Sequence, residues 1–242
     1  MNIIKQCRYG KMILNRRDSW VGDSLDIYGE FSESEVEVFR KHIKPGDVVL
    51  DIGANIGAHT VALSRLVGDN GIVVAFEPER YNYYTLCGNL ALNNIFNVIA
   101  FQQGVGNKLG TIKVPFINTP QNTNYGNLEL DKDYSAYPHY DVPCVTIDKL
   151  GLDKCAFIKA DVEGMEKAVL EGGLETIKKF KPVLYLEDDR EEKSTELRKY
   201  VEELGYKIVE HGAELFNKNN FNGEKFNIFG EIISKNILCI SN

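Results

Sequence analysis

The stretch 48–77 constrains the fold most, because two apolar runs flank a glycine-rich turn and a helical pattern. The first run ends at Asp51, the turn reads GANIG, and the second run ends at Glu77. A strand, a tight turn, a helix and a strand in this order predict a parallel β-α-β unit, whose crossover is nearly always right-handed. The carboxyl ends of such strands form a ligand crevice, so we expect a cofactor there.

The alternation of strand and helix patterns continues along the chain. A helix is predicted before the first of these strands, because Ser32 suits an N-cap, Glu35 suits its capping-box partner, and Lys44-Pro45-Gly46 ends the pattern. The last two strands follow one another without a helix, which predicts an antiparallel pair at one sheet edge. The other elements expected from periodicity are helices over 57–66, 80–93, 165–180 and around 197–204, and strands over 97–102, 142–147, 156–161, 182–187, 206–210 and 236–240. An open, doubly wound α/β sheet is the leading fold.

Three segments fall outside this rhythm. The first residues predict a short hairpin about Tyr9-Gly10, and the polar stretch 16–29, which contains Trp20, predicts a loop. An irregular insert covers about 106–141, with one strand expected over 110–116; we assign 117–140 to acceptor binding, a plain surface loop being the alternative. No linker divides the chain. We therefore expect a single domain over 1–242, with an extension and first helix over 1–44 and a Rossmann-like core over 45–242.

Charge and composition narrow the partners. A net charge of −7 gives no general attraction to phosphate backbones, which disfavours nucleic acid. No apolar run reaches the roughly 18–20 residues of a membrane span, and the first residues lack a signal peptide, so we expect a cytoplasmic protein with no membrane contact. The five cysteines are scattered without zinc spacing and indicate reduced thiols. The sequence does not determine the oligomeric state, so a homo-oligomer is possible.

The glycine turn indicates what binds at the strand ends. Gly53 and Gly57 allow the backbone to turn sharply and to approach a ligand. Their spacing differs from the G-x-G-x-x-G of a dinucleotide site, and Asp51 just before the turn would repel a pyrophosphate but attract a cation. S-adenosylmethionine suits this turn, because it carries an ammonium and a sulfonium and no phosphate. Glu77 stands where an acid accepts hydrogen bonds from ribose hydroxyls.

Several motifs follow in a fixed order: VVLDIGANIGAHT, AFEP, NLALNN, VTIDKL, FIKADVEGMEKAVLEGG and KPVLYLE. Together they resemble the FkbM family of S-adenosylmethionine-dependent methyltransferases over about residues 28–187, and the terminal NILCIS resembles it more weakly. The resemblance implies the class I methyltransferase fold, which is Rossmann-like and has a seven-stranded, mostly parallel sheet with an antiparallel last strand.

The resemblance also implies which residues hold the cofactor. By matching position, the glycine turn surrounds the methionine end, Glu77 holds the ribose and residues 103–105 contact the adenine, where QQGVG departs from the small residues that the family often shows. The segment YGEF at 28–31 would close over the cofactor. The implied cofactor-binding residues are Tyr28, Glu30, Asp51, Gly53, Ala54, Asn55, Gly57, Thr60, Glu77, Pro78, Gln103, Gly104 and Asp161.

The DVEG motif adds candidate catalytic residues. Asp161 lies at the carboxyl end of a strand expected beside the transferred methyl, and capping of the following helix is its alternative role. A hydroxyl acceptor must lose a proton, and the candidate bases are Asp161, Glu187, His139 and His59, among which the sequence does not choose. The acidic residues at 161, 163 and 187–189 could provide oxygen ligands for a divalent metal ion, but the sequence shows no compact spacing of metal ligands. A metal is therefore not favoured, and we expect no metal ligand.

The leading hypothesis is S-adenosylmethionine-dependent O-methylation of a hydroxyl on a sugar, glycan or other small metabolite, an acceptor class that the resemblance implies. The first alternative is an inactive cofactor-binding or regulatory module of the same fold. An NAD-dependent oxidoreductase is disfavoured by the glycine spacing. A nucleic-acid methyltransferase is disfavoured by the acidic balance.

Overall fold

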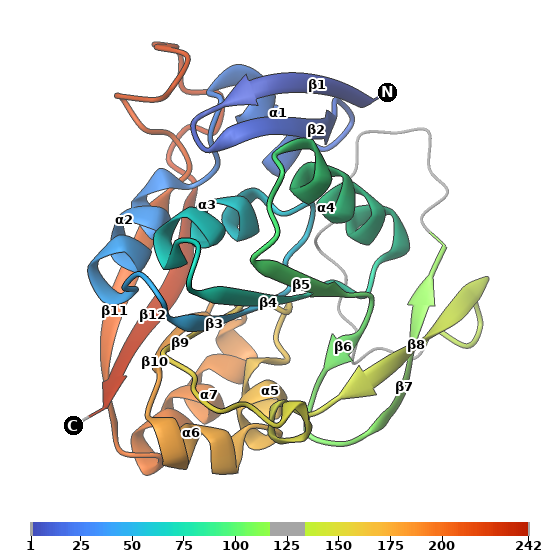
Figure 1. Cartoon of the computed structure of the whole chain (residues 1–242), viewed down its shortest axis with the longest axis vertical. Helices are drawn as coiled ribbons and strands as arrows, with labels where there is room; N and C mark the ends of the chain where they lie inside the picture. The colour runs from blue at the N-terminus through green and yellow to red at the C-terminus, as the bar shows by residue number, and fades with distance from the viewer. Residues whose placement is uncertain (1, 117–133, 242) are drawn as a thin grey trace.

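A seven-stranded sheet forms the centre of the molecule in the computed structural model, which describes residues 2–116 and 134–241 (Figure 1). The strand order is β11-β12-β10-β9-β3-β4-β5. The strands from β10 to β5 in this order run parallel, and β12 runs antiparallel to both β10 and β11. The strands are β3 (Val48–Ile52), β4 (Ile72–Phe76), β5 (Val98–Phe101), β9 (Phe157–Ala160), β10 (Val183–Glu187), β11 (Tyr206–Glu214) and β12 (Ile233–Ser241). The predicted sheet and its antiparallel last strand are confirmed.

Helices cover both faces of this sheet. Figure 1 shows α2, α3 and α4 on one face and α5, α6 and α7 on the other. The central strands are mostly apolar because both faces are covered, and Leu50 and Phe157 have no exposed surface. The helices are α2 (Glu33–His42), α3 (Ala58–Val67), α4 (Arg80–Leu92), α5 (Glu166–Glu171), α6 (Leu174–Phe180) and α7 (Glu191–Glu203).

The single helix predicted over 165–180 is wrong, because the chain breaks it into α5 and α6 at Gly172 and Gly173. A Cβ added to Gly172 would lie 2.0 Å from the carbonyl oxygen of Gly106, and one added to Gly173 would lie 2.9 Å from Ile147. The two glycines thus let this turn pack directly against Gly106 of the insert and against Ile147 just after it. Periodicity alone did not reveal that contact.

The stretch 16–29, predicted as a loop, contains the short helix α1 (Val21–Ile27). Val21 and Leu25 are buried in a cluster with the side chains of the N-terminal hairpin. Tertiary packing therefore forms a helix that the polar sequence pattern hides.

The predicted N-terminal hairpin is confirmed as β1 (Asn2–Cys7) and β2 (Gly10–Asn15). Asn89 of α4 connects it to the glycine turn: its Oδ1 accepts from the amide of Ile13 at 2.6 Å, and its Nδ2 donates to the carbonyl oxygens of Ile13 and Ile56 at 3.2 and 2.8 Å. Asn89 has no exposed surface. Asn89 of the NLALNN motif thus holds the N-terminal hairpin and the glycine turn together.

The insert forms a separate three-stranded sheet in the order β6-β8-β7. Its strands are β6 (Gly104–Val105), β7 (Gly110–Pro115) and β8 (His139–Val145), and the 3-10 helix η1 (Ile147–Leu150) follows. The strand predicted over 142–147 is therefore part of this small sheet and not of the central one. Residues 117–133, which include most of the stretch assigned to acceptor binding, lie outside the described residues. Across the described ranges, no helix has the length and apolar character needed to cross a membrane.

Candidate functional site

Two adjoining cavities lie at the carboxyl ends of the central strands. The larger cavity has a volume of about 290 Å³ and the smaller cavity about 40 Å³. Gly53, Glu77, Asp161 and Glu163 line both of them. These residues follow β3, β4 and β9, so the β-α-β unit and the DVEG motif meet at one place.

The glycine turn is held against both neighbouring strands. The amides of Gly53 and Ala54 donate to the carbonyl oxygen of Phe76 at 3.0 and 2.9 Å. Gly53 and Asn55 have φ angles of 81° and 52°, and a Cβ added to Gly53 would lie 1.8 Å from the carbonyl oxygen of Asp161. Only glycine allows this approach. Gly53, Ala54 and Asn55 line the larger cavity.

Asp51 lies beneath the turn and not in the cavity wall. It has no exposed surface, and its Oδ2 accepts from the hydroxyl of Thr60 at 2.6 Å. Its Oδ1 lies 3.3 Å from Nζ of Lys159, the residue beside it in the register of β3 and β9. Gly57 is the N-cap of α3, where an added Cβ would lie 2.6 Å from Leu86. Asp51, Gly57 and Thr60 therefore support the turn from below.

Lys159 is a buried cation that connects this turn to the DVEG motif. Its Nζ lies 3.5 Å from Oδ2 of Asp161 and donates to the carbonyl oxygen of Gly53 at 3.3 Å. Burial opposes its charge, but the carboxylates of Asp51, Asp161 and Glu35 outweigh burial and raise the pKa of Lys159. The cavity floor thus carries a fixed positive charge between acids.

Glu77 lies at the border of the two cavities. Its Oε2 accepts from the amide of Asn55 at 2.7 Å and its Oε1 from the amide of Glu79 at 2.9 Å. Burial raises the pKa of Glu77 to about 8, although these two hydrogen bonds favour the charged form. Pro78, Gln103 and Gly104 line the smaller cavity beside it, so the residues predicted to contact ribose and adenine lie together.

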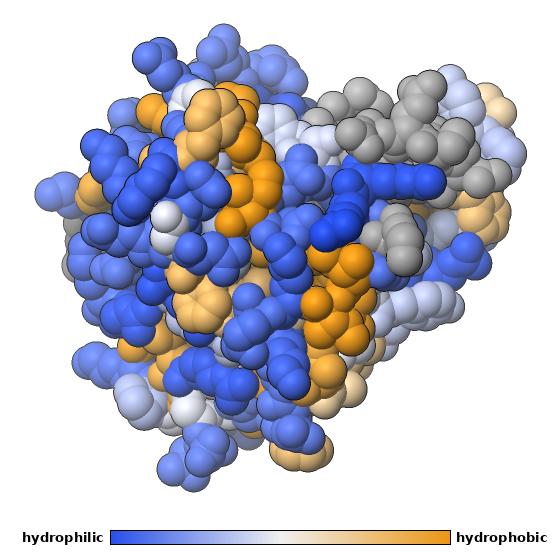
Figure 2. Space-filling model, turned by 90° about the horizontal axis from the view of Figure 1, so that it is seen from above, coloured by the Kyte–Doolittle hydropathy of each residue, from blue (hydrophilic) through white to orange (hydrophobic). Residues whose placement is uncertain are grey.

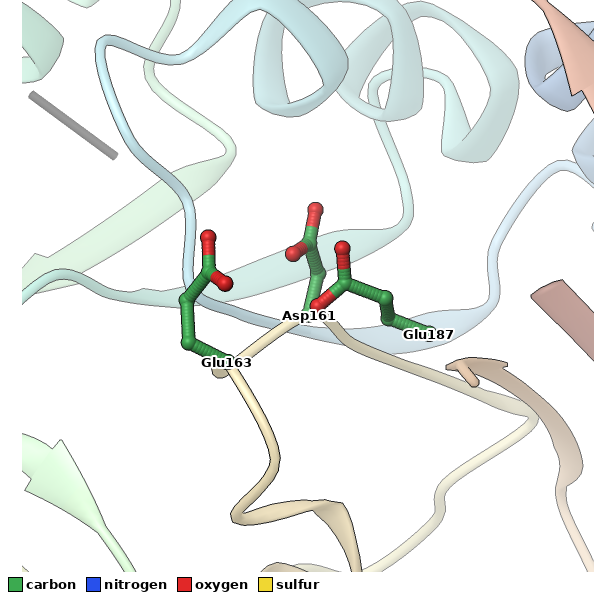
Figure 3. A group of neighbouring side chains, drawn as sticks. All are labelled: Asp161, Glu163 and Glu187. Carbon is green, nitrogen blue, oxygen red and sulfur yellow. The ribbon is translucent and has the colours of Figure 1, made fainter. Parts of the chain in front are cut away.

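Three carboxylates gather at the ends of β9 and β10. Asp161, Glu163 and Glu187 each place an oxygen within 4.8 Å of the other two, and Figure 3 shows their carboxyl groups converging. Burial raises the pKa of Glu163 to about 8, with repulsion from Asp161 adding to the shift, and burial raises that of Glu187 well above its ordinary value. Oε2 of Glu187 is buried and has no hydrogen-bond partner among the described residues.

This acidic group has the oxygen ligands and spacing for one hard divalent cation. Arg190 already pairs with Glu163, and Lys159 pairs with Asp161, so two cations compensate part of its charge. Asp161 does not cap the following helix, α5, whose N-cap position is occupied by Met165. Oε1 of Glu166 instead accepts from the amides of Val162 and Gly164, at 3.0 and 3.3 Å.

The two histidines considered as bases lie in different places. His59 lines the larger cavity between the rings of Phe31 and Phe39, and burial, together with the charge of Lys159, lowers its pKa well below 6.5. His139 lies on β8, where its ring nitrogens contact Nζ of Lys113 at 3.0 Å and the carbonyl oxygen of Tyr137 at 2.8 Å. It is not among the residues that line either cavity.

A sequence model of the FkbM methyltransferase domain matches residues 51–208, which is more than half of the chain. The chain belongs to the FkbM methyltransferase family. A comparison with curated protein sequences finds no match.

Solved structures show the same fold at low sequence identity. The methyltransferase FkbM of Methylobacillus flagellatus is 20% identical with a TM-score of 0.55, over 85% of this chain and 50% of that chain, so this chain spans about half its length. A methyltransferase of Streptococcus mutans in complex with SAH is 13% identical with a TM-score of 0.51, over 87% and 97% of the two chains. An S-adenosylmethionine-dependent O-methyltransferase of Thermotoga maritima is 14% identical with a TM-score of 0.50, over 86% and 64%. The fold is that of the class I methyltransferases.

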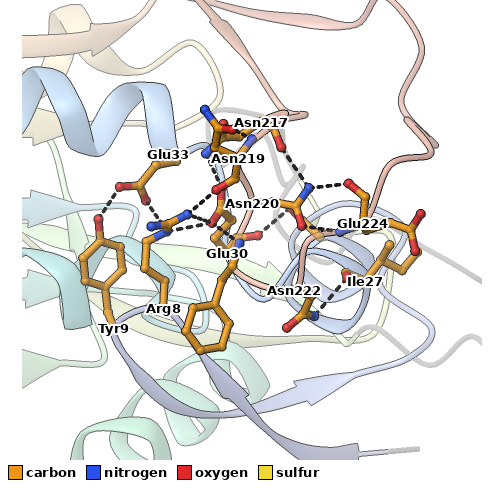
Figure 4. A network of polar contacts seen from close by, with 12 residues as sticks. Arg8, Tyr9, Ile27, Glu30, Glu33, Asn217, Asn219, Asn220, Asn222 and Glu224 are labelled. Carbon is orange, nitrogen blue, oxygen red and sulfur yellow. Dashed lines mark hydrogen bonds and ion pairs between the residues drawn. The ribbon is translucent and has the colours of Figure 1, made fainter.

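In this FkbM-family chain, Tyr28 and Glu30 anchor the segment between β11 and β12, and Figure 4 shows the contacts of Glu30. The hydroxyl of Tyr28 donates to the carbonyl oxygen of Phe226 at 3.0 Å and accepts from the amide of Ile228 at 2.8 Å. Glu30 accepts from the amide of Phe221 and from Nδ2 of Asn217, both at 2.8 Å. Neither Tyr28 nor Glu30 lines the larger or the smaller cavity. Their side chains instead hold the segment between β11 and β12.

The anchored segment forms an apolar wall of the larger cavity. Leu215, Ile232 and Ile233 line it together with Trp20, whose ring stacks on Phe229 at 5.9 Å. Ile232 and Ile233 are 46% and 51% exposed. Figure 2 shows apolar patches among the polar residues of the face seen from above. The acids and this wall give the larger cavity two chemically different sides.

The sequence analysis did not identify Lys159, Glu35 or the residues of the apolar wall as part of the site. A lysine inside the otherwise apolar run FIKAD was a usable signal, because a charge at a buried strand position needs a partner. The wall residues gave no such signal, since an isoleucine at a strand end has the same sequence pattern whether it packs inward or rims a cavity.

Proposed function

We propose that this protein transfers the methyl group of S-adenosylmethionine to a hydroxyl of a sugar, glycan or other small metabolite. Its membership of a methyltransferase family gives the reaction class. One observation supports the finer assignment: a glycine turn, a ribose-type acid and a cluster of carboxyl groups line two adjoining cavities that share four residues.

The residues present fit the cofactor. A Cβ at Gly53 would collide with the carbonyl oxygen of Asp161, so glycine lets the turn lie directly against the DVEG motif, beside Glu77 and the smaller cavity. Glu77 would hold the ribose, Pro78 and Gln103 the adenine, and the turn the methionine end. The glycine spacing of the turn, which differs from the G-x-G-x-x-G of a dinucleotide site, disfavours NAD. The cofactor would supply a methyl group on a positively charged sulfur.

The chain's own part in the reaction is to bind and orient the acceptor. Asp161, whose side chain is 41% exposed and paired with Lys159, would accept a hydrogen bond from a polar group of the acceptor next to the reacting hydroxyl. The unpartnered Oε2 of Glu187 offers a second polar contact on the same side. Holding two reactants in line accounts for much of the rate in such displacements. The apolar wall would bind the remainder of the acceptor.

Calorimetric titration tests the cofactor assignment. Wild-type protein is expected to bind S-adenosylhomocysteine and not NAD. Glu77→Gln replaces one of the two oxygens that accept from backbone amides with an NH2 group, which cannot accept a hydrogen bond from an amide or from a ribose hydroxyl, so its affinity for S-adenosylhomocysteine should fall roughly 10-fold or more. Glu192→Gln on the exposed surface of α7 is the control and should bind like wild type. Binding of NAD in place of S-adenosylhomocysteine would overturn the assignment.

A panel of hydroxyl acceptors with radiolabelled S-adenosylmethionine then tests turnover. Label transferred to a member of the panel supports an active O-methyltransferase. Tight cofactor binding without transfer to any member would favour the inactive regulatory module instead.

A further inference from the structure

The first turn of α2 orients a carboxyl group toward the larger cavity. Glu35 is 5% exposed and lines this cavity. The hydroxyl of Ser32 donates to Oε1 of Glu35 at 2.7 Å and makes no capping bond to the helix backbone. Ser32 is fully buried and has a φ of 44°, a conformation that costs free energy in a residue other than glycine. The sequence pattern of a capping box therefore serves here to hold a carboxyl group.

A chain of polar groups leads from this carboxyl group away from the cavity. The ring of Tyr185, a residue of β10 that is 1% exposed, packs against Phe39, one helical turn after Glu35, and hydrogen bonding to the Tyr185 hydroxyl opposes the rise in the pKa of Glu35. The same hydroxyl lies 2.7 Å from Nδ1 of His211 on β11. Phe39 packs edge-on against the ring of Tyr185 at 5.0 Å and keeps it in place. His211 is half-buried and reaches the surface.

The charges around the chain suit a group that gains and loses a proton near neutral pH. Burial raises the pKa of Glu35 to about 7, and Asp161 adds to the rise, while Ser32, Lys159 and Tyr185 oppose it. Burial, with the charge of Lys41, lowers the pKa of His211. Burial and the neighbouring Glu35 raise the pKa of Tyr185, so its phenol stays protonated and passes a proton only as it receives another. A base is most effective when its pKa is close to the working pH.

We propose that Glu35 takes the proton of the acceptor hydroxyl and that Tyr185 and His211 carry it to solvent. This inference rests on the proposed methyl transfer to a hydroxyl. As the hydroxyl oxygen forms its bond to the methyl carbon, the bond from that carbon to sulfur breaks, sulfur keeps the electron pair, and the hydroxyl proton moves to the Glu35 carboxylate. The Glu35 proton then moves to the Tyr185 oxygen while the Tyr185 proton moves to Nδ1 of His211, and the imidazolium releases its Nε2 proton to water.

Nitrogen-15 NMR of the histidine rings tests the chain without an acceptor. In wild-type protein, the His211 ring shifts should follow a second titration step near pH 7 in addition to the step of the ring itself. Glu35→Gln and Tyr185→Phe should each remove the second step. Glu33→Gln is the matched control, because Glu33 lies in the same helical turn but hydrogen-bonds Tyr9, and it should keep both steps. His211→Gln assigns the signals. Identical His211 curves in all of these proteins would overturn the proposal.

Turnover of an acceptor found in the panel gives the second measurement. Glu35→Gln should lower kcat roughly 100-fold or more at pH 7 while the affinity for S-adenosylhomocysteine stays unchanged. Tyr185→Phe should lower kcat and flatten its dependence on pH. An unchanged kcat in Glu35→Gln would refute the role of Glu35. Failure of wild type to bind S-adenosylhomocysteine would refute the proposed function itself, so the two failures are distinguishable.

Discussion

At the scale of single residues, Lys159 is a charged side chain that is buried at the site and paired with two carboxylates. Its side chain is 3% exposed, and it lies between the carboxylates of Asp51 and Asp161, 3.3 and 3.5 Å away. A buried ion pair gains little over apolar residues of the same shape, but removing one partner leaves a buried charge alone. We therefore expect Lys159 to contribute to the stability of the fold as well as to the charge of the site.

We expect Lys159→Met to lower the free energy of unfolding at pH 7 by about 3–5 kcal/mol, since the buried Asp51 would lose its counter-charge. Urea denaturation followed by circular dichroism measures the change. Lys154→Met is the control, because the Lys154 side chain is 51% exposed and lies 3.9 Å from Asp47, so its loss should cost less than about 1 kcal/mol. Equal losses in both variants would contradict the account of Lys159.

At the scale of elements, the glycine turn between β3 and α3 connects cofactor binding to packing. Two glycines in the chain share a left-handed conformation but differ in surroundings: Gly53 has a φ of 81° and abuts Asp161, whereas Gly46 has a φ of 86° and nothing within 4 Å of an added Cβ. Comparing the two separates backbone strain from close approach.

Gly46→Ala should lower the free energy of unfolding by about 1 kcal/mol, which is the cost of a left-handed backbone conformation for alanine. Gly53→Ala adds a contact of 1.8 Å with the carbonyl oxygen of Asp161, so it should cost at least about 2–3 kcal/mol and weaken binding of S-adenosylhomocysteine. Thermal unfolding with and without ligand measures both effects. Similar effects from the two substitutions would mean that the close approach does not matter.

The same elements show what a sequence can reveal. The turn was predictable because positive φ angles favour glycine whatever the tertiary contacts are, and the central strands were predictable because burial on both faces leaves a continuous apolar run. Helix α1 and the break at Gly172 were not, because each depends on a contact with a distant segment. The local sequence around Glu35 predicted a capping box. It could not indicate that Glu35 lies near Tyr185, because Tyr185 is 150 residues further along the chain.

At the scale of the whole molecule, acidic side chains are concentrated at one end of the sheet, where the fold partly buries them. Glu35, Glu77 and Glu166 are 5%, 6% and 4% exposed, and burial raises the pKa of the three to about 7, 8 and 7. Burying these carboxyl groups lowers the stability of the fold at neutral pH, and functional sites are often destabilised in this way.

This cost predicts how stability depends on pH. In the unfolded chain Glu166 ionises near its ordinary value of 4.5, whereas in the fold it keeps its proton to about pH 7. Between these values the folded state binds more protons, so the contribution of Glu166 is complete below about pH 4.5 and is lost as the pH rises to about 7. Glu166→Gln removes this titration but keeps an oxygen for the amides of Val162 and Gly164.

From pH 5 to pH 7, wild type should therefore lose roughly 2 kcal/mol of unfolding free energy relative to Glu166→Gln, at up to about 1.4 kcal/mol per pH unit. The buried His59 acts in the opposite direction below its ordinary pKa of 6.5, but it is present in both proteins and cancels in the difference. Urea denaturation at half-unit pH steps measures this difference, with Glu175→Gln as the exposed control. A difference that stays constant with pH would mean that Glu166 ionises normally in the fold, and that burial at this end of the sheet does not hold protons on its acids.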